Sequence, residues 1–362
     1  MDRSPLRNPS VPRRKGLFVP TVGLAVALVT GACTAGASVA PSTSTPLTAS
    51  ASVVAATPTP TTSPSPAATQ PAFPLTITDD EGTAVTIPHQ PNRIVSLTPA
   101  STEELFALGD GGLLVGDTDS DDYPAAAKAL PHVATYQGVI MEKLVAAQPD
   151  LVIAGGDGFT HPADVTHMRS LGIPVVVIYA ATVPAVLADL RLVGEAAGQL
   201  PAASAMTAAM QSRMDAIAAL ARAEPTHPSV FYEIGVGPDI YGPAQDSFVA
   251  DMVVLAGGTP ITTGDPNSYT IALEKLVVAD PQVIVLGDYD YGTTVADVVK
   301  RPGWEHLTAV VDGAIRPVDD TIVTRPGPRL ADGLAALALA IDPTLVLPAD
   351  LMPPPTAVPS PS

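Results

Sequence analysis

An internal repeat limits the folds that are open to this chain. Residues 141–154 read MEKLVAAQPDLVIA and residues 273–286 read LEKLVVADPQVIVL, at an offset of 132 residues. Each copy predicts a short helix that a proline, Pro149 or Pro281, brings to an end, followed by a buried strand. Continuous apolar runs of this kind are typical of parallel strands covered on both faces. The offset is too long for a solenoid repeat and predicts two similar lobes instead.

Other apolar runs extend the pattern through both lobes. Helices are expected to begin near Ser101 and to cover Ser247–Leu255, between apolar runs that predict further strands at residues 93–97, 113–116, 175–179 and 230–234. Strands that alternate with helices predict an α/β fold with parallel sheets. Residues 182–224 are helical in pattern, and residues 201–223 would form a helix of about 34 Å. The predicted fold class is therefore two parallel-sheet α/β lobes joined by a long rigid helix.

The amino terminus has the layout of a secretory signal. Basic residues come first, the apolar run 17–30 follows, and Gly31-Ala32-Cys33 ends it. The apolar run is shorter than the roughly 20 residues that span a bilayer. Cys33 is the only cysteine, and it falls where a bacterial lipoprotein signal has its lipid-modified residue. An uncleaved anchor and plain secretion are the alternatives.

Composition divides the rest of the chain into segments. Ala, Ser, Thr and Pro make up 33 of residues 34–72, a composition that cannot bury a core and predicts disorder. The expected organisation is a signal at 1–33, a tether at 34–74, an N-terminal lobe at 75–181 and connecting helices at 182–224. A C-terminal lobe at 225–345 and a loose Pro-rich tail at 346–362 complete it.

The net charge excludes one class of partner. The chain has 36 Asp and Glu against 18 Lys and Arg, a formal charge of -18. Nucleic-acid binding needs clustered Lys and Arg, so it is not expected. A single cysteine also excludes a disulfide framework and a cysteine-based metal site.

The sequence has no catalytic signature that we recognise. It lacks a Gly-x-Ser-x-Gly elbow, a His-Glu-x-x-His helix and a Walker loop. Gly235 and Gly237 follow a predicted strand, but Pro238 breaks the helix that a dinucleotide site needs. We therefore expect no enzymatic activity and no cofactor.

Two polar clusters raise the question of a metal. His161, Asp164 and His167 could share one side of a short helix, and such a set can bind a transition metal. The aspartates between Asp117 and Asp122 alternate like part of a calcium loop but lack the required glycine and closing glutamate. A solvated loop is the favoured interpretation in both cases, so no metal site is expected.

Glu142 and Glu274 occupy the same place in the two repeats, at the first turn of a helix. An acidic residue there complements the helix dipole, which explains each one separately. It does not explain why the surrounding residues match as well. An equivalent carboxylate in each lobe could clamp a roughly two-fold symmetric partner that carries Arg.

A resemblance to a known family joins these features. The chain resembles the periplasmic substrate-binding proteins of cobalamin and ferric-siderophore ABC importers, the class with a rigid helical backbone, and most closely the cobalamin-binding type. The motifs that carry the likeness are residues 93–99, 102–109, 122–124, 142–153, 170–174, 255–258, 274–286, 301–304 and 325–329. The family implies two α/β lobes on one long helix. It also implies that Glu142 and Glu274 pair with Arg pockets on the two permease subunits, which work with ATPase subunits.

The resemblance implies a ligand between the lobes. Aromatic positions of the cobalamin-binding proteins correspond to or lie near Tyr136, Phe159, Tyr241 and Tyr269, and the corrinoid-like segments contain Asp320 and Arg325. Many acids near the expected cleft disfavour an anionic chelate. An amide-rich corrinoid is thus favoured, and a ferric siderophore or haem-like chelate is the alternative. The expected protein is a monomer that is lipid-anchored through Cys33 on the outer face of the membrane and delivers ligand to the permease.

Overall fold

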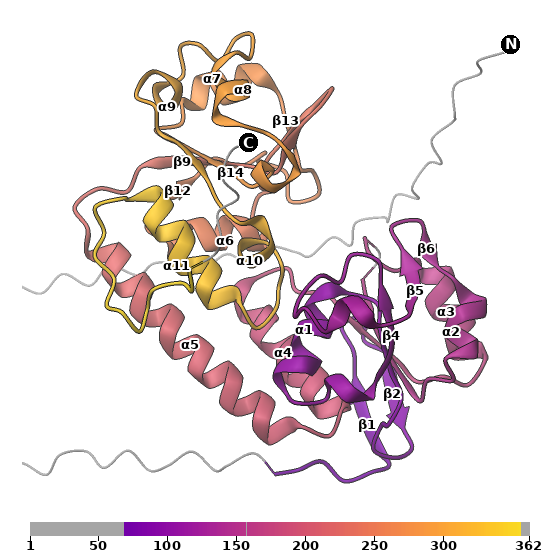
Figure 1. The fold of residues 1–362 in the computed structure, drawn as a ribbon. Helices are drawn as coiled ribbons and strands as arrows, with labels where there is room; N and C mark the ends of the chain where they lie inside the picture. Colours follow the sequence, from indigo (N-terminus) through magenta and orange to yellow (C-terminus); the bar gives the residue numbers. More distant parts are fainter. Residues whose placement is uncertain (1–68, 157, 356–362) are drawn as a thin grey trace, which may run out of the picture. The chain divides into compact units, whose positions relative to one another are not determined.

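The structure is a computed structural model that describes residues 69–355 except Asp157 (Figure 1). The predicted signal, Cys33 and nearly all of the tether lie outside the described residues. The described part opens with an antiparallel hairpin of β1 (Leu75–Thr78) and β2 (Ala84–Ile87). No helix of the described part is long and apolar enough to cross a membrane.

The N-terminal lobe is built on a six-stranded sheet in the order β6-β5-β4-β3-β7-β8. All neighbouring strands are parallel except β5 and β6. The strands are β3 (Ile94–Ser96), β4 (Leu114–Thr118), β5 (His132–Thr135), β6 (Gly138–Val139), β7 (Leu151–Gly155) and β8 (Val175–Ile178). The helices are α1 (Pro99–Ala107), α2 (Met141–Ala146) and α3 (Pro162–Ser170).

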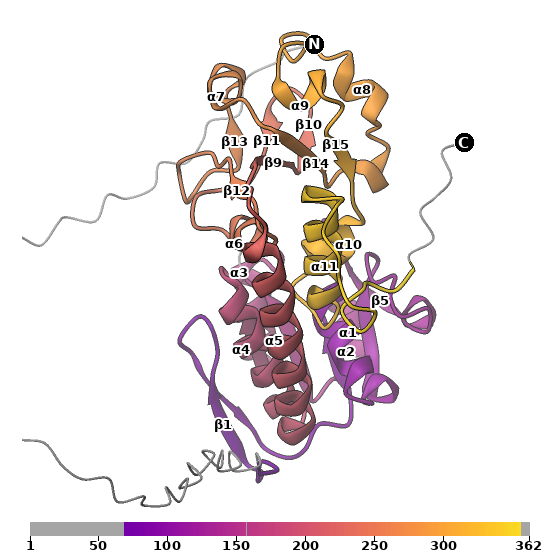
Figure 2. The ribbon, with the colours of Figure 1, turned by 90° about the vertical axis from the view of Figure 1, so that its left-hand side faces the viewer.

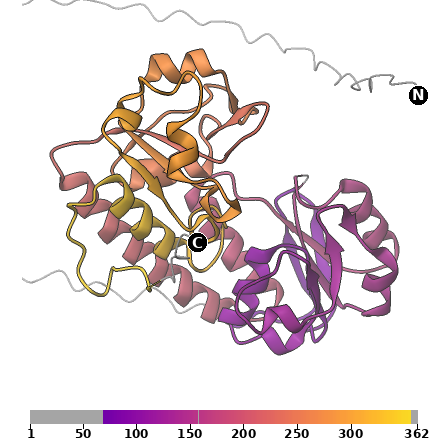
Figure 3. The ribbon, with the colours of Figure 1, turned by 45° about the horizontal axis from the view of Figure 1, so that its top comes forward.

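Strand β7 is apolar throughout because both of its faces are buried. Leu151 and Ile153 pack in one core cluster with Leu105 of α1. Val152 packs in another cluster with Met168 of α3, on the opposite face of the sheet. Helices therefore cover both faces, as continuous apolar strands predict (Figure 3).

The C-terminal lobe repeats this construction with a parallel sheet in the order β12-β9-β14-β15. Its strands are β9 (Ser229–Glu233), β12 (Thr259–Pro260), β14 (Val283–Leu286) and β15 (Ile315–Pro317). A small antiparallel sheet contains β10 (Gly235–Val236), β11 (Ile240–Tyr241) and β13 (Thr270–Ile271). The helices are α6 (Phe248–Leu255), α7 (Leu273–Ala279), α8 (Val295–Val299), α9 (Thr308–Val311), α10 (Asp320–Val323) and α11 (Leu330–Ile341).

The repeat seen in the sequence extends to the backbone. Helices α2 and α7 each bury one leucine completely, Leu144 and Leu276. Each helix is followed by a residue with positive φ directly before the proline: Gln148 has φ 47° and Asp280 has φ 42°. The equivalent strands β7 and β14 then enter their sheets. The predicted two-lobed α/β architecture is thus confirmed.

Two antiparallel helices connect the lobes, α4 (Val183–Ala196) and α5 (Leu200–Ala223) (Figure 2). Beside the start of α5, the Gln199 amide donates to Asp110 of the N-terminal lobe at 2.9 Å. Near its end, α5 meets the C-terminal lobe, where an added Cβ at Gly257 would lie 3.1 Å from the Ala221 Cβ. The 24-residue helix α5 therefore spans both lobes, as predicted.

Helix α4 also joins the two hydrophobic cores. Its first two turns contribute Val186 and Leu190 to the core of the C-terminal lobe. Its last turns contribute Val193 and Ala196 to the core of the N-terminal lobe. The sequence did not single out α4 in this role.

The expected loose tail is wrong for the residues that follow α11. Leu347 and Leu351 are buried and belong to the core of the C-terminal lobe. Arg213 of α5 donates to the carbonyl oxygens of Leu351 at 3.2 Å and Met352 at 3.0 Å. Burial of the leucines outweighs the proline-rich composition that suggested a loose tail. Residues 356–362 lie outside the described part.

Candidate ligand-binding site

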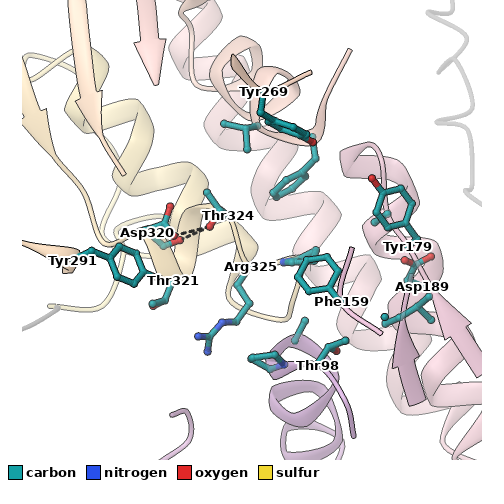
Figure 4. Close-up of a pocket in the computed structure, with 18 residues that line it drawn as sticks. Thr98, Phe159, Tyr179, Asp189, Tyr269, Tyr291, Asp320, Thr321, Thr324 and Arg325 are labelled. Atoms are coloured by element: carbon teal, nitrogen blue, oxygen red, sulfur yellow. Dashed lines mark hydrogen bonds between the residues drawn. The ribbon is translucent and has the colours of Figure 1, made fainter. Parts of the chain in front are cut away.

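A cavity of about 400 Å³ has a lining drawn from both lobes and from α4 (Figure 4). Its walls are largely apolar, with a small number of polar groups, which is the usual composition of a ligand site. Aromatic rings dominate the walls, and three charged or titratable side chains accompany them. The rings are those of Phe159, Tyr179, Phe248, Tyr269 and Tyr291, and the other three side chains are Asp189, Asp320 and Arg325.

Two glycines at the carboxyl end of β7, Gly155 and Gly156, make room for the aromatic wall of the N-terminal lobe. A Cβ added at Gly155 would lie 2.6 Å from the Phe159 Cβ, and one added at Gly156 would lie 3.0 Å from the Tyr179 Cβ. The distance at Gly155 is shorter than real Cβ atoms show, and the distance at Gly156 is tighter than most real Cβ contacts. These glycines therefore allow Phe159 and Tyr179 to sit against the strand ends and face the cavity (Figure 4).

The opposite wall comes from loops of the C-terminal lobe. Tyr269 directly precedes β13, and Tyr291 ends the 3-10 helix Tyr289–Tyr291. The four residues Phe159, Tyr179, Tyr269 and Tyr291 are between 46% and 78% exposed, and all of them line the same cavity. Large apolar side chains gathered and left exposed in a cavity mark a binding surface.

Two carboxyl groups belong to the lining. Asp320 begins α10 and accepts hydrogen bonds from Tyr232 Oη and Thr324 Oγ1, each at 2.9 Å. Its pKa is raised, chiefly by burial. Asp189 lies on α4, and burial together with the nearby Asp80 carboxyl raises its pKa to about 8. At neutral pH Asp189 therefore keeps its proton and can donate a hydrogen bond as well as accept one.

The cation of the described lining, Arg325, is already neutralised. Its Nη1 donates to Glu103 Oε1 at 2.7 Å and to Asp122 Oδ1 at 2.8 Å. Burial disfavours the charged guanidinium, but these hydrogen bonds outweigh burial and raise the Arg325 pKa. The lining thus offers no unpaired positive charge among the described residues.

The structure brings together four of the six residues expected to bind ligand: Phe159, Tyr269, Asp320 and Arg325. Tyr136 and Tyr241 are not among the lining residues. Tyr136 follows β5 and is 87% exposed, and Tyr241 is paired in the small antiparallel sheet. The cavity therefore gives no support to these two assignments.

Sequence reasoning missed four of the aromatic or acidic lining residues: Tyr179, Phe248, Tyr291 and Asp189. Tyr179 directly follows β8, and Tyr291 lies five residues beyond the end of β14. Ligands of open α/β sheets bind beyond the carboxyl ends of the strands, so this rule could have identified both tyrosines. Asp189 lies within a helix, and only its packing turns it toward the cavity.

Glu142 and Glu274 are both exposed in the first turns of α2 and α7. Within residues 69–355, neither carboxylate takes part in an ion pair or side-chain hydrogen bond. The lysine after each glutamate is held elsewhere: Lys143 Nζ donates to the His132 carbonyl at 3.2 Å, and Lys275 Nζ donates to the Thr263 carbonyl. Both carboxylates are therefore left available to a partner.

The two polar clusters considered for a metal are divided among other contacts. Asp117 accepts from His132 Nδ1 at 2.7 Å, and Asp121 accepts from the Thr118 hydroxyl. His161 and His167 lie on the surface of α3 and its N-cap. In the described part of the chain, no group of three His, Cys, Asp or Glu residues has the geometry of a metal site.

Comparison with known proteins agrees with the fold and the motifs. The profile of the periplasmic binding protein family matches residues 94–320. An uncharacterized ABC transporter substrate-binding lipoprotein of Bacillus subtilis is 33% identical over 275 residues, which are 75% of this chain and 86% of that protein. A cobalamin-binding protein of Halobacterium salinarum is 30% identical over 285 residues, 76% of each chain.

A solved structure supports the same conclusion. The protein from an ABC-type Fe3+-hydroxamate transport system of Saccharomonospora viridis superposes with a TM-score of 0.62 and 26% sequence identity. The match covers 75% of this chain and 100% of that one. With the repeat, the two lobes and the helix that spans them, these matches confirm the predicted resemblance. The chain belongs to the periplasmic binding protein family.

Proposed function

We propose that this protein is the extracytoplasmic substrate-binding component of an ABC importer and that it captures a corrinoid in the cavity between its lobes. The observation that carries the proposal is the cavity itself, with aromatic walls, two carboxyl groups and a neutralised arginine. The names of the Bacillus subtilis and Halobacterium salinarum relatives support the transport class and the ligand class respectively.

The aromatic walls suit a flat macrocycle. Phe159 and Tyr179 from the N-terminal lobe and Tyr269 and Tyr291 from the C-terminal lobe line the cavity and could stack on a planar ligand. Stacking and burial of such rings contribute much of the affinity in small-molecule sites. A corrin ring is broad and flat enough to use all four.

The polar groups suit carboxamides better than carboxylates. Asp320 can accept from an amide N–H, and protonated Asp189 can also donate to an amide oxygen. Haem brings two propionates and ferric catecholates bring several negative charges, and Arg325 already serves Glu103 and Asp122. An anionic ligand would enter this cavity without a counter-charge, which disfavours it.

An uncharged ferric hydroxamate is the second candidate. A ferric trihydroxamate can be neutral, so it needs no counter-charge in this cavity, and it offers amide-like oxygens. The structural neighbour from the Fe3+-hydroxamate system supports this alternative. The aromatic walls favour the flat corrinoid over a globular chelate.

Delivery to the permease would use Glu142 and Glu274. We infer that each carboxylate pairs with a cationic pocket on one permease subunit, and that the ATPase subunits complete the importer. In each lobe a partly exposed valine follows the glutamate by three residues: Val145 is 44% exposed and Val277 is 42% exposed. Cys33 would carry the lipid, and residues 34–74 would tether the lobes to the membrane.

A titration of the full chain tests the ligand. We expect saturable binding of cyanocobalamin with a Kd below about 1 µM by isothermal titration calorimetry. Tight binding of a neutral ferric trihydroxamate alone would replace the corrinoid with the second candidate. Tight binding of haem alone would contradict the charge argument.

A further inference from the structure

A short segment of the C-terminal lobe packs directly on α1 of the N-terminal lobe. This segment, residues 325–329, lies between α10 and α11. A Cβ added at Gly327 would lie 3.5 Å from the Ala100 Cα, so the two backbones meet closely. Ala100, Arg325 and Pro326 all line the cavity. The contact between the lobes is therefore part of the cavity wall.

One buried carboxylate organises this contact. The Glu103 side chain is 2% exposed. It accepts from Arg325 Nη1 at 2.7 Å, from Arg329 Nη2 at 2.6 Å and from Arg329 Nε at 2.8 Å. Both arginines belong to the opposite lobe, so Glu103 is bound entirely from across the cleft.

Two residues of the N-terminal lobe complete the arrangement. Asp122 accepts a second hydrogen bond from Arg325 at 2.8 Å. The Arg329 guanidinium carbon lies 4.1 Å from the centre of the Tyr123 ring, in a cation–π contact. We call Glu103, Asp122, Arg325 and Arg329 the inter-lobe cluster.

The charges of this cluster balance only with Glu103 in place. Arg325 and Arg329 are close enough to repel, and each is partly buried, with 15% and 18% of its side chain exposed. Removing one member of a buried ion pair leaves an uncompensated charge, which is more costly than replacing the whole pair. Loss of the Glu103 charge would therefore drive the two arginines toward water and away from α1.

We propose that Glu103 is a positioning residue that sets the width of the ligand cavity by holding Arg325 and Arg329 of the opposite lobe. Helices α4 and α5 join the lobes, and the inter-lobe cluster fixes their spacing at the cavity wall. The width of the cavity in turn selects ligands by thickness. The selection of ligands rests on the proposed function, whereas the role of Glu103 in setting the width of the cavity does not.

The spacing can be measured without ligand. The full chain with Cys33→Ser carries two spin labels, on Lys128→Cys in the N-terminal lobe and Val311→Cys in the C-terminal lobe. Both positions are exposed. Pulsed electron paramagnetic resonance then measures the distance between the lobes. Glu103→Gln should move the mean distance by more than about 2 Å or broaden its distribution clearly. An unchanged distribution in folded Glu103→Gln would overturn the proposal.

Glu233→Gln is the matched control. Glu233 is a buried glutamate that accepts from Arg301 at 2.5 and 2.7 Å, but both residues lie in the C-terminal lobe. This change should lower the unfolding temperature and leave the inter-lobe distance unchanged. An equal shift in both variants would mean general loosening and would also overturn the proposal. If Glu103→Gln does not fold, Asp122→Asn decides instead, since Asp122 is half-exposed and the loss of its charge should also move the mean distance or broaden its distribution.

Ligand kinetics give a separate readout. For whichever ligand binds, Glu103→Gln should raise the dissociation rate by on the order of tenfold, because affinity changes within one site act mostly on dissociation. Glu233→Gln should leave that rate unchanged. Should cyanocobalamin not bind at all, the corrinoid proposal fails while the distance measurement on free protein still tests Glu103.

Discussion

Lys143 and Lys275 make the same contact in the two lobes, each donating from Nζ to a backbone carbonyl of a neighbouring segment, that of His132 or Thr263. Each lysine follows an exposed glutamate in the first turn of a helix. The contact draws the ammonium group away from the carboxylate beside it. The lysine beside each glutamate therefore does not neutralise Glu142 or Glu274.

The first prediction concerns these glutamates. The double change Glu142→Ala and Glu274→Ala should leave ligand affinity within about twofold and abolish uptake, since the carboxylates lie outside the cavity and a few anchor residues carry most of the binding energy of an interface. Ligand titration and uptake of labelled ligand by whole cells are the two measurements. Glu305→Ala, at another exposed acid of the C-terminal lobe, is the control and should permit normal uptake. Normal uptake in the double variant would refute the docking role.

The second prediction separates cavity aromatics from the others. Phe159→Ala and Tyr179→Ala should each weaken ligand binding by about tenfold, or roughly 1.4 kcal/mol, because each removes a ring face from the cavity wall. Tyr136→Ala removes an equally large but outlying ring and should change affinity by less than about twofold. Calorimetric titration of the three variants decides. A loss at Tyr136 equal to that at Phe159 would restore the assignment that the cavity does not support.

The third prediction concerns the pH dependence of stability. Asp189 has a pKa of about 8 in the folded chain, against about 3.9 for an unfolded aspartate. Between these values the folded chain holds a proton that the unfolded chain has lost. The free energy of unfolding should therefore fall as pH rises through this window, by up to about 1.4 kcal/mol per pH unit.

Asp189→Asn tests this dependence because asparagine does not titrate. Urea denaturation at several pH values between about 5 and about 8 should show a shallower fall in the free energy of unfolding than in the unaltered chain. The exposed Asp312→Asn change is the matched surface control. If the free energy of unfolding falls with pH as steeply in Asp189→Asn as in the unaltered chain, the raised pKa of Asp189 would be contradicted.

The fourth prediction concerns the packing of α10 on α11. A Cβ added at Gly333 would lie 1.9 Å from the Ile322 carbonyl oxygen, a backbone atom that cannot move independently. Gly333→Ala should therefore lower the free energy of unfolding by about 1–3 kcal/mol, the usual cost of overpacking. Gly112→Ala is the control, since an added Cβ there meets nothing within 4 Å. Equal denaturation midpoints for the two variants would exclude the clash.

The fifth prediction concerns the membrane anchor. If Cys33 carries the lipid, Cys33→Ala should move the protein from the detergent phase to the aqueous phase on phase separation of cell extracts. It should also abolish incorporation of labelled palmitate. Retention of the label in Cys33→Ala would show that the lipid is elsewhere.

The sequence predicted the regular parts of the fold well because they are long or continuously apolar. Strand β14 (Val283–Leu286) follows α7 and Pro281 as the second copy of the repeat predicted, and helix α5 begins one residue before the predicted Pro201 and ends at the predicted Ala223. Two-residue strands such as β10 and β13 depend on pairing with distant segments, so no local pattern reveals them.

The site was predicted less completely for a related physical reason. Phe159, Tyr269, Asp320 and Arg325 come from loops and helix starts near strand ends, where family motifs are informative. Asp189 faces the cavity only because α4 packs between the lobes. The partners of Arg325 are more than 200 positions away in the chain, at Glu103 and Asp122, and no local sequence pattern shows such a contact.

The division of α4 between two cores has a consequence for folding. Val186 and Leu190 are buried in one lobe while Val193 and Ala196 are buried in the other, along a single unbroken helix. Neither lobe can melt without pulling apolar side chains of this helix into water, and fraying half of a helix removes the hydrogen bonds that support the rest. The two lobes should thus behave as one cooperative unit, with a single calorimetric transition in place of two.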